Sequence, residues 1–280
     1  MSSKQGTPPL AGHKLTIAYA GTAYFGWQRQ VGHSSVQEEI EKVMARIWGR
    51  HISLEGSGRT DTGVHAMAQV ASFFAPRKLD AVTLQRAFNS YLPFPIRVTR
   101  VEFPERTFHA RFDVAWKTYE YRIWNAPFHD PFLVDRVWHV PRPLDLGLMG
   151  EAAALLQGKL DCAALATNSG YARKTTVRTI RALEVKRRGC LVTVRVTADG
   201  FLYHMVRNIV GALTKIGRGR LSVAEFAGIM KSGKRTLAPD SAPAFGLYLM
   251  KVAYFPKRVR LERAKERRVP VYEREREEEG

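Results

Sequence analysis

A short segment bracketed by glycines, Gly58 to Gly63, holds an arginine, a threonine and an aspartate in the order G-R-T-D-T-G. Glycine permits a tight turn that presents neighbouring side chains at a cleft. Arg59, two residues from Asp61, favours the ionised carboxylate, which can act as a general base or a nucleophile. Arg59 could also bind a phosphate. The alternative is an ordinary Asp-Thr-Gly turn without a catalytic role.

The residue order around Asp61 argues against two other kinds of site. A P-loop for nucleoside triphosphates requires the order G-x-x-x-x-G-K-[ST], which this segment lacks. Aspartic proteases carry Asp-Thr-Gly, but they need a second such element, and the sequence contains none. The segment therefore supports carboxylate chemistry of another class.

A second candidate segment runs from Phe201 to Gly211, where apolar residues recur at helical spacing. Most of this segment is predicted to be core. Arg207 and Asn208 are its polar exceptions. Arg207 either reaches the surface along its aliphatic stem or directs its charge into a cleft.

A third segment, Lys117 to Ile123, alternates like a strand and places Lys117, Tyr119 and Tyr121 on one face. A tyrosine beside basic residues can stack on an unstacked nucleic-acid base. Cross-strand packing of the aromatic rings is the structural alternative. The fourth segment, Phe25 to Gln30, combines aromatic, amide and cationic side chains, and it either contacts RNA or packs on its own rings.

Periodicity predicts the elements that position these segments. Strands are predicted over residues 13–20, 67–74, 96–103, 108–124 (long or broken), 176–186, 190–197 and 246–255. Helices are predicted over 36–48 after a Ser35–Glu38 capping box, to residue 91 after Asp80, and over 146–157, 201–216 and 222–231. Strands and helices in mixed order predict the α+β class, with two α/β halves and mainly antiparallel sheets flanked by helices.

Domain boundaries follow from the same pattern. We expect an N-terminal half over residues 12–110, a C-terminal half over 111–256 and a charged extension over 257–280. The extension holds nine basic and seven acidic residues, which indicates a frayed helix or a disordered tail. Most of the net charge of +18 therefore lies on the folded body and indicates a polyanionic partner, either a nucleic acid or an anionic membrane.

The absence of long apolar segments and the cysteine content indicate the cellular compartment. No apolar run approaches the roughly 18 residues of a membrane-spanning helix, and the N-terminus lacks the apolar stretch of a signal peptide. Membrane attachment is therefore not expected. Cys162 and Cys190 form neither a disulfide framework nor a zinc site, and both are predicted to be buried. A reducing, cytoplasmic compartment fits this cysteine content.

Taken together and in order, these segments resemble the bacterial tRNA pseudouridine synthase A family over about residues 13–255. The motifs are G-x-x-x-F-G-W-Q at 21–28, G-R-T-D-x-G-V-H-A at 58–66, K-x-Y-x-Y-R-I at 117–123, F-L-x-x-M-V-R-N at 201–208 and A-P-x-x-G-L-x-L at 242–249. Ala20 departs from the pattern, because the family usually has Asp before Gly-Thr. This departure puts the capping of that loop in doubt.

The resemblance implies a role for each matching residue. Asp61 matches the family's essential aspartate, which attacks the ribose or removes a ribose proton to give a glycal. Arg59 helps to extrude the target nucleotide from its stack. Tyr119 stacks on the flipped uracil, and Arg207 pairs with Asp61 and keeps it ionised. The remaining implied contacts are an apolar pocket wall at Leu247 and supporting RNA contacts at Gln28, Thr60 and His65.

The resemblance also implies the reaction and the partners. The family isomerises uridine to pseudouridine in the anticodon stem-loop of tRNA, at tRNA positions 38, 39 and 40, without a cofactor or a metal. Its two halves meet at a cleft that holds the active site, and it works as a homodimer on tRNA. From the residues alone two alternatives remain: a catalytically silent RNA-binding protein, and a hydrolase that releases the base.

Overall fold

The computed structural model describes residues 9–168 and 175–265. Its strands are β1 (Leu10–Tyr19), β2 (Glu55–Gly56), β3 (His65–Pro76), β4 (Ile96–Glu102), β5 (Val114–Trp124), β6 (Trp138–His139), β7 (Gly158–Asp161), β8 (Val177–Arg188), β9 (Leu191–Ala198) and β10 (Leu247–Tyr254). They form one sheet in the order β4-β1-β3-β10-β5-β9-β8-β7, with β2 paired to β3 and β6 to β5. The sheet is thus continuous through both halves of the chain.

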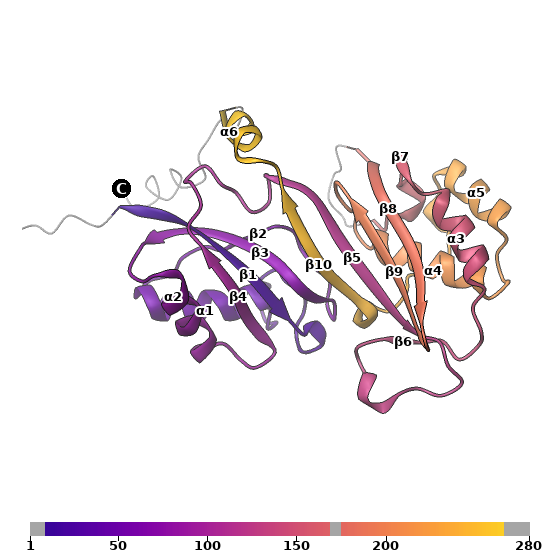
Figure 1. The fold of residues 1–280 in the computed structure, drawn as a ribbon, viewed down its shortest axis with the longest axis horizontal. Coiled ribbons are helices and arrows are strands. Elements are labelled where there is room, and N and C mark those ends of the chain that lie inside the picture. The colour runs from indigo at the N-terminus through magenta and orange to yellow at the C-terminus, as the bar shows by residue number, and fades with distance from the viewer. Residues whose placement is uncertain (1–8, 169–174, 266–280) are drawn as a thin grey trace, which may run out of the picture.

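Within the described residues, six α-helices accompany the sheet. They are α1 (Val36–Trp48), α2 (Ala81–Tyr91), α3 (Leu146–Ala154), α4 (Met205–Gly217), α5 (Val223–Ser232) and α6 (Lys257–Lys265). Figure 1 shows α1 and α2 beside β1, β3 and β4 at one end of the sheet, and α3, α4 and α5 beside β7, β8 and β9 at the other. The middle of the sheet, β10 and β5, lies between these two groups of helices.

The last strand, β10, joins the two ends of the molecule. It pairs parallel to β3, with Tyr248 opposite His65, and antiparallel to β5, with Leu247 opposite Tyr121. The loop that carries Asp61 leads directly into β3. A residue at the start of β10 therefore lies near both the Asp61 loop and the middle of β5.

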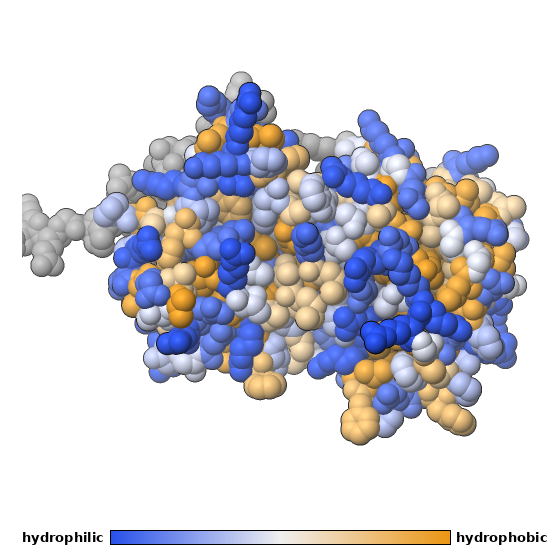
Figure 2. Space-filling view, viewed as in Figure 1, coloured by the Kyte–Doolittle hydropathy of each residue, from blue (hydrophilic) through white to orange (hydrophobic). Residues whose placement is uncertain are grey.

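The two faces of β5 have different environments. Tyr119, Tyr121 and Ile123 are buried in the main hydrophobic core, on the side from which Phe201 packs edge-on against Tyr119. On the opposite face Glu120 pairs with Arg122 and Arg195, at 3.0 and 2.6 Å. Hydrophilic side chains gather over β8 and β9 in the view of Figure 2.

The predicted α+β class with a mainly antiparallel sheet is confirmed. The helices predicted after Ser35 and Asp80 begin as expected, and the helix predicted from Ser222 begins one residue later, at Val223. Each of the three side chains accepts a hydrogen bond from the backbone of the first turn. The short strands β2, β6 and β7 were not predicted. The division near residue 110 stays a prediction.

Three predictions were wrong. Helix α4 begins at Met205 rather than Phe201, because a turn that ends at His204, with a φ of 60°, precedes it. Strand β5 begins at Val114 rather than residue 108, because Asp113 accepts a hydrogen bond from the backbone of His109 and closes a turn there. Cys162 is buried, but Cys190 is exposed in the turn between β8 and β9.

The beginning of the predicted charged extension is helical. Helix α6 is tied to the body by Arg260, whose guanidinium lies 2.5 Å from Glu105. Residues 266–280 of the predicted extension lie outside the described residues. Among the described helices, none has the length and apolarity that crossing a membrane requires.

Candidate active site

The loop that carries Asp61 is anchored through its backbone. The Nζ atom of Lys117 donates a hydrogen bond to the carbonyl of Ser57 at 2.7 Å. The amide of Gln69 donates to the carbonyl of Gly58 at 2.9 Å, and its oxygen accepts from the Ser57 hydroxyl at 2.6 Å. These contacts tie the loop to β5 and β3, so Asp61 is presented from a fixed backbone.

Lys117 has an unusual electrostatic environment. Burial, with a smaller contribution from the charge of Arg111, lowers the pKa of Lys117 to about 8. Its hydrogen-bond acceptor is the neutral carbonyl of Ser57. Lys117 thus supports the Asp61 loop from the interior of the protein.

The carboxylate of Asp61 meets two side chains from the start of α4. Its Oδ2 atom lies 3.3 Å from Nη1 of Arg207 and 3.4 Å from Nε2 of His204. Arg207 also donates through Nε to the carbonyl of Ala242 at 2.8 Å, which orients the guanidinium. The guanidinium thus gives the carboxylate a charge-assisted hydrogen bond from a fixed direction. The Asp61 side chain keeps 23% of its surface exposed, so a substrate can reach it.

The sequence reasoning assigned no role to His204, which the structure places at Asp61. His204 precedes the first turn of α4 in the left-handed region, and its ring stacks on that of Tyr203 at 3.8 Å. Burial lowers the pKa of His204; the carboxylate of Asp61 opposes this shift, whereas the charge of Arg207 adds to it. A neutral imidazole therefore faces the carboxylate at neutral pH. Histidine is among the residues enriched in the left-handed region, but this preference is too weak to predict such a residue before a helix.

Tyr119 and Leu247 come from the two central strands. Both are buried, and Leu247 lies opposite Tyr121, two residues along β5 from Tyr119. Burial raises the pKa of Tyr119, and the nearby Tyr19 and Asp61 raise it further. Tyr119 is therefore a neutral phenol close enough to Asp61 to sense its charge. The structure brings Asp61, Arg207 and Tyr119 together, as the predicted site requires.

The loop at residues 25–28 packs directly on the Asp61 loop. The backbone nitrogen of Trp27 donates to the carbonyl of Thr60 at 3.1 Å. Gly26 has a φ of 82°, and a Cβ atom there would lie 2.5 Å from the same carbonyl. Glycine is needed at this position because the two backbones approach so closely.

Among the other predicted contacts, Arg59 and Gln28 lie at the surface. Arg59 is exposed, and its Nε donates to Oε1 of Gln28 at 3.2 Å. The two predicted RNA-contacting side chains thus lie side by side on the two loops that Trp27 and Thr60 join. This placement leaves both available to a nucleic acid.

Thr60 and His65 are placed differently, because both are buried. The Thr60 hydroxyl hydrogen-bonds with that of Tyr19 at 2.8 Å. His65 accepts from the backbone of Gly21 through Nδ1 at 3.1 Å, and its Nε2 lies 3.0 Å from the carbonyl of Phe245. Burial lowers the pKa of His65 to about 4, which agrees with this neutral tautomer. Both side chains brace the site and present little surface to RNA.

His65 also accounts for the unusual Ala20. The short 3-10 helix η1 (Gly21–Ala23) begins after Ala20 without a side-chain cap. The nitrogen of His65 accepts from the first backbone N–H of η1, that of Gly21, while the backbone nitrogen of Ala20 donates to Pro95. The loop is therefore capped from β3.

Comparison with known proteins agrees with this arrangement. The model of the tRNA pseudouridine synthase family matches residues 15–113 and 152–255. The chain belongs to this family. A tRNA pseudouridine synthase A of Methylacidiphilum infernorum is 49% identical over 88% of this chain and 97% of the relative. Proteins of the same name from Thermoanaerobacter sp. and Nostoc sp. are each 40% identical over 86% of this chain, and over 98% and 85% of their own lengths.

As a tRNA pseudouridine synthase, the chain is an isomerase that converts uridine to pseudouridine in tRNA. The resemblance drawn from the five motifs is thereby confirmed. Within the described residues, no group of three or more His, Cys, Asp or Glu side chains is arranged to hold a metal ion.

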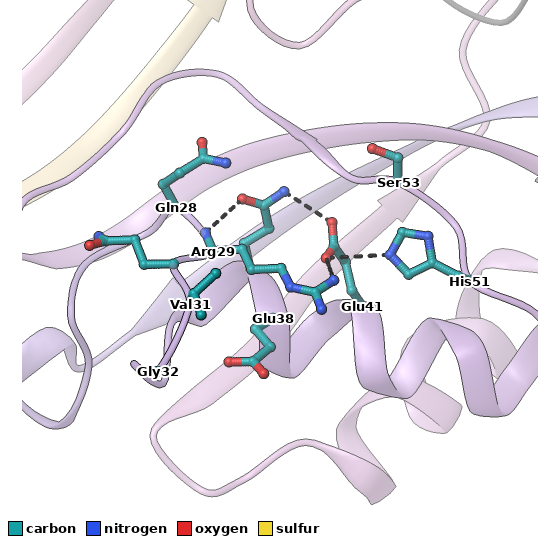
Figure 3. A pocket seen from close by; sticks show the side chains of 10 residues that line it. Gln28, Arg29, Val31, Gly32, Glu38, Glu41, His51 and Ser53 are labelled. Atoms are coloured by element: carbon teal, nitrogen blue, oxygen red, sulfur yellow. Dashed lines mark hydrogen bonds and ion pairs between the residues drawn. The ribbon is translucent and has the colours of Figure 1, made fainter. Parts of the chain in front are cut away.

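A pocket of about 610 Å³ lies beside the loop that carries Gln28 in this synthase (Figure 3). The carboxylate of Glu41 points into it and accepts from the Gln37 amide at 3.0 Å and the Leu54 backbone at 3.2 Å. The guanidinium of Arg29 lies 3.6 Å from the same carboxylate. Glu41 is buried and already has these partners, so it holds the loop after Gln28 in place through Arg29. It is not a free nucleophile.

Proposed function

We propose that this tRNA pseudouridine synthase acts on uridine in the anticodon stem-loop, that Asp61 is its catalytic group, and that it needs no cofactor. The observation that carries the proposal is the partly exposed Asp61 carboxylate, which lies 3.3 Å from Arg207 beside the buried ring of Tyr119. A carboxylate fixed by a charged hydrogen bond on a rigid loop is a preorganised nucleophile or base.

In the proposed reaction the bond from ribose C1′ to uracil N1 breaks and a bond from C1′ to uracil C5 forms. N1 gains a proton and C5 loses one, so the product has the same atoms and oxidation state as the substrate. Asp61 either bonds to C1′ or removes the C2′ proton to give a glycal. A primary isotope effect with uridine deuterated at C2′ would support the glycal, and its absence would support attack at C1′.

Three other residues serve the flipped nucleotide in this proposal. Tyr119 stacks on the uracil, and Leu247 contributes the apolar wall next to it, since both lie on adjacent central strands. Arg59, exposed beside Gln28, occupies the place in the stack that the uridine leaves. As a neutral phenol, Tyr119 can donate its hydroxyl hydrogen to the base without carrying charge into the site.

The wider surface fits a large polyanion. With a net charge of +18, the protein can make many phosphate contacts, which fix position and orientation on the RNA. We also propose that the protein works as a homodimer in the cytoplasm, with each tRNA contacting both subunits. Sedimentation of the pure protein with and without tRNA tests this assembly.

The decisive experiment is to incubate pure protein with unmodified tRNA transcripts, without added cofactor, and to map pseudouridine. We expect it in the anticodon stem-loop. Pseudouridine confined to another region would refute the proposed target. Release of free uracil would identify a glycosidic-bond hydrolase, and tRNA binding without any product would identify a silent RNA-binding protein.

A further inference from the structure

A second pocket, of about 220 Å³, lies against the C-terminal half of α4, away from Asp61. Its polar and charged lining residues are Thr214, Lys215, Arg218, Arg220, Asp240 and Ser241. Three cations thus face one carboxylate, so the lining is positively charged. The proposed reaction uses none of these side chains.

Two polar atoms of this lining have no hydrogen-bond partner. Among the described residues, the buried side-chain nitrogen and oxygen atoms without a hydrogen-bond partner are the Thr214 hydroxyl and the Arg218 Nε. Thr214 is 1% exposed. A buried donor without a partner is costly, and such atoms therefore mark places where a ligand or water binds. Both residues line the same pocket, which is unexpected if the two unpartnered atoms are unrelated defects.

The cations are not needed to cap the helix. The carbonyls of Thr214, Lys215 and Ile216 accept hydrogen bonds from backbone nitrogens of the turn at residues 218–220. The carbonyl of Gly217 accepts from the backbone nitrogen of Asp145 at 2.8 Å. Since the last carbonyls of α4 are satisfied by backbone donors, the guanidinium of Arg218 is available for another partner.

The pocket is physically connected to the active site. Its wall, Asp240 and Ser241, continues into Ala242, which exchanges two hydrogen bonds with Arg207, at 2.8 and 3.0 Å. Arg218 directly follows the last residue of α4 as its C-cap, about 16 Å along the helix axis from Arg207. A few nucleotides of RNA span such a distance. An RNA whose uridine lies at Asp61 can therefore present a backbone phosphate here.

We propose that this pocket binds a phosphate group of the tRNA backbone, with Arg218 and Lys215 as cationic donors and Thr214 as a hydroxyl donor. Guanidinium groups match phosphate oxygens well, and a phosphate in this pocket would lie beside the two residues that carry the unpartnered donors. Free inorganic phosphate would make the same contacts, and the experiments below distinguish it from a phosphate of the tRNA backbone. This proposal rests on the proposed function, in which the substrate is tRNA. The phosphate contact would fix the position of the RNA relative to Asp61.

The test compares Arg218→Gln with Lys231→Gln, which removes one positive charge from an exposed site at the end of α5, outside the pocket. The affinity for tRNA is measured over a range of salt concentrations. We expect Arg218→Gln to weaken binding by about threefold to tenfold and to reduce the salt slope by about one. Lys231→Gln should leave both quantities near wild type.

Thr214→Val, which keeps the shape of the side chain, should weaken binding without changing the salt slope. If Arg218→Gln unfolds, Arg218→Lys provides the test, because it keeps the charge but loses the planar fork and should still bind tRNA more weakly. Wild-type affinity and salt slope in folded Arg218 variants would refute the proposal and leave water as the partner of the two donors.

Inorganic phosphate is the second probe. Thermal stabilisation of the wild type by phosphate, but not of Arg218→Gln, together with wild-type tRNA affinity in that variant, would identify free phosphate as the ligand and overturn the RNA assignment. A reduced tRNA salt slope without phosphate binding supports the RNA assignment. These binding assays do not depend on the modified position, so modification outside the anticodon stem-loop would refute the proposed target and leave the pocket assignment intact.

Discussion

Nη1 of Arg207 lies 3.3 Å from Oδ2 of Asp61, although the two residues are 146 positions apart in the sequence. The guanidinium is fixed at its other edge by the carbonyl of Ala242 at 2.8 Å. Helix α4 and the segment before β10 therefore converge on one carboxylate that belongs to the loop before β3. The cationic partner of Asp61 is supplied from the other half of the chain.

Replacing Arg207 tests this relationship. Arg207→Ala removes the charge-assisted hydrogen bond to Asp61, so we expect the rate of pseudouridine formation to fall by about 10- to 100-fold. The free energy of unfolding should fall only modestly, because Arg207 lies at the edge of the core. Single-turnover rates and a denaturant titration measure the two effects. Global unfolding of the variant would instead assign Arg207 a structural role.

Asp61→Ala removes the proposed nucleophile or base itself. We expect no measurable pseudouridine, with tRNA affinity close to that of the wild type, because phosphate contacts supply most of the affinity. Binding and product formation are measured on the same transcript. Turnover comparable to the wild type would exclude Asp61 from the mechanism.

His204 is predicted to position the carboxylate. His204→Asn should preserve the left-handed backbone, which asparagine tolerates, but the shorter side chain loses the contact with Asp61. We expect a decrease of about tenfold in kcat, with KM nearly unchanged, because the affected interaction acts at the reacting group. His204→Gly, which also relaxes the backbone, should show the same loss. Unchanged kcat in both variants would mean that the contact is incidental.

Much of the fold was predictable because its signals are local. Ser35 and Asp80 cap helices whose apolar residues recur at helical spacing, and buried residues alternate along β1 and β9. The turn before α4 was not predictable, because Leu202 fits the apolar face of the helix that follows. Its side chain packs in the core from a turn instead. Periodicity cannot distinguish these two cases.

The site depended on long-range contacts that no local pattern encodes. Asp61, Arg207 and Tyr119 were placed together by resemblance to a family, since periodicity gives no information about residues so far apart. For the same reason, local patterns predicted neither the contact of His204 with Asp61 nor the burial of Thr60 and His65. An isolated polar residue in a motif can serve the substrate or the scaffold, and only its surroundings distinguish the two roles.

Gly211 is predicted to set the position of the segment that orients Arg207. A Cβ atom at Gly211 would lie 2.0 Å from the carbonyl of Asp240. Gly211→Ala should therefore displace residues 240–242, lower stability and reduce kcat. Gly228→Ala is the matched control: the position is also helical, but nothing lies within 4 Å of its added methyl group. It should stabilise the protein by roughly 0.5–1 kcal/mol, and equal effects of the two changes would contradict the argument.

Lys117 predicts a dependence of stability on pH. Its pKa in the folded protein is about 8, lowered from 10.5 by burial. Between these values the unfolded chain holds a proton that the folded protein lacks, so stability rises with pH. One such proton contributes about 1.4 kcal/mol per pH unit. This gain in the free energy of unfolding is absent below pH 8 and grows as the pH rises toward 10.5.

The measurement is the free energy of unfolding of wild type and Lys117→Met from pH 7 to 9.5, below the range in which the buried tyrosines titrate. The wild type should gain stability relative to the variant above pH 8. Lys231→Met, which removes an exposed lysine, should follow the wild type. Parallel curves for wild type and Lys117→Met would show that Lys117 stays charged in the fold. The Asp61 loop would then be supported by an ammonium ion above pH 8 as well as below it.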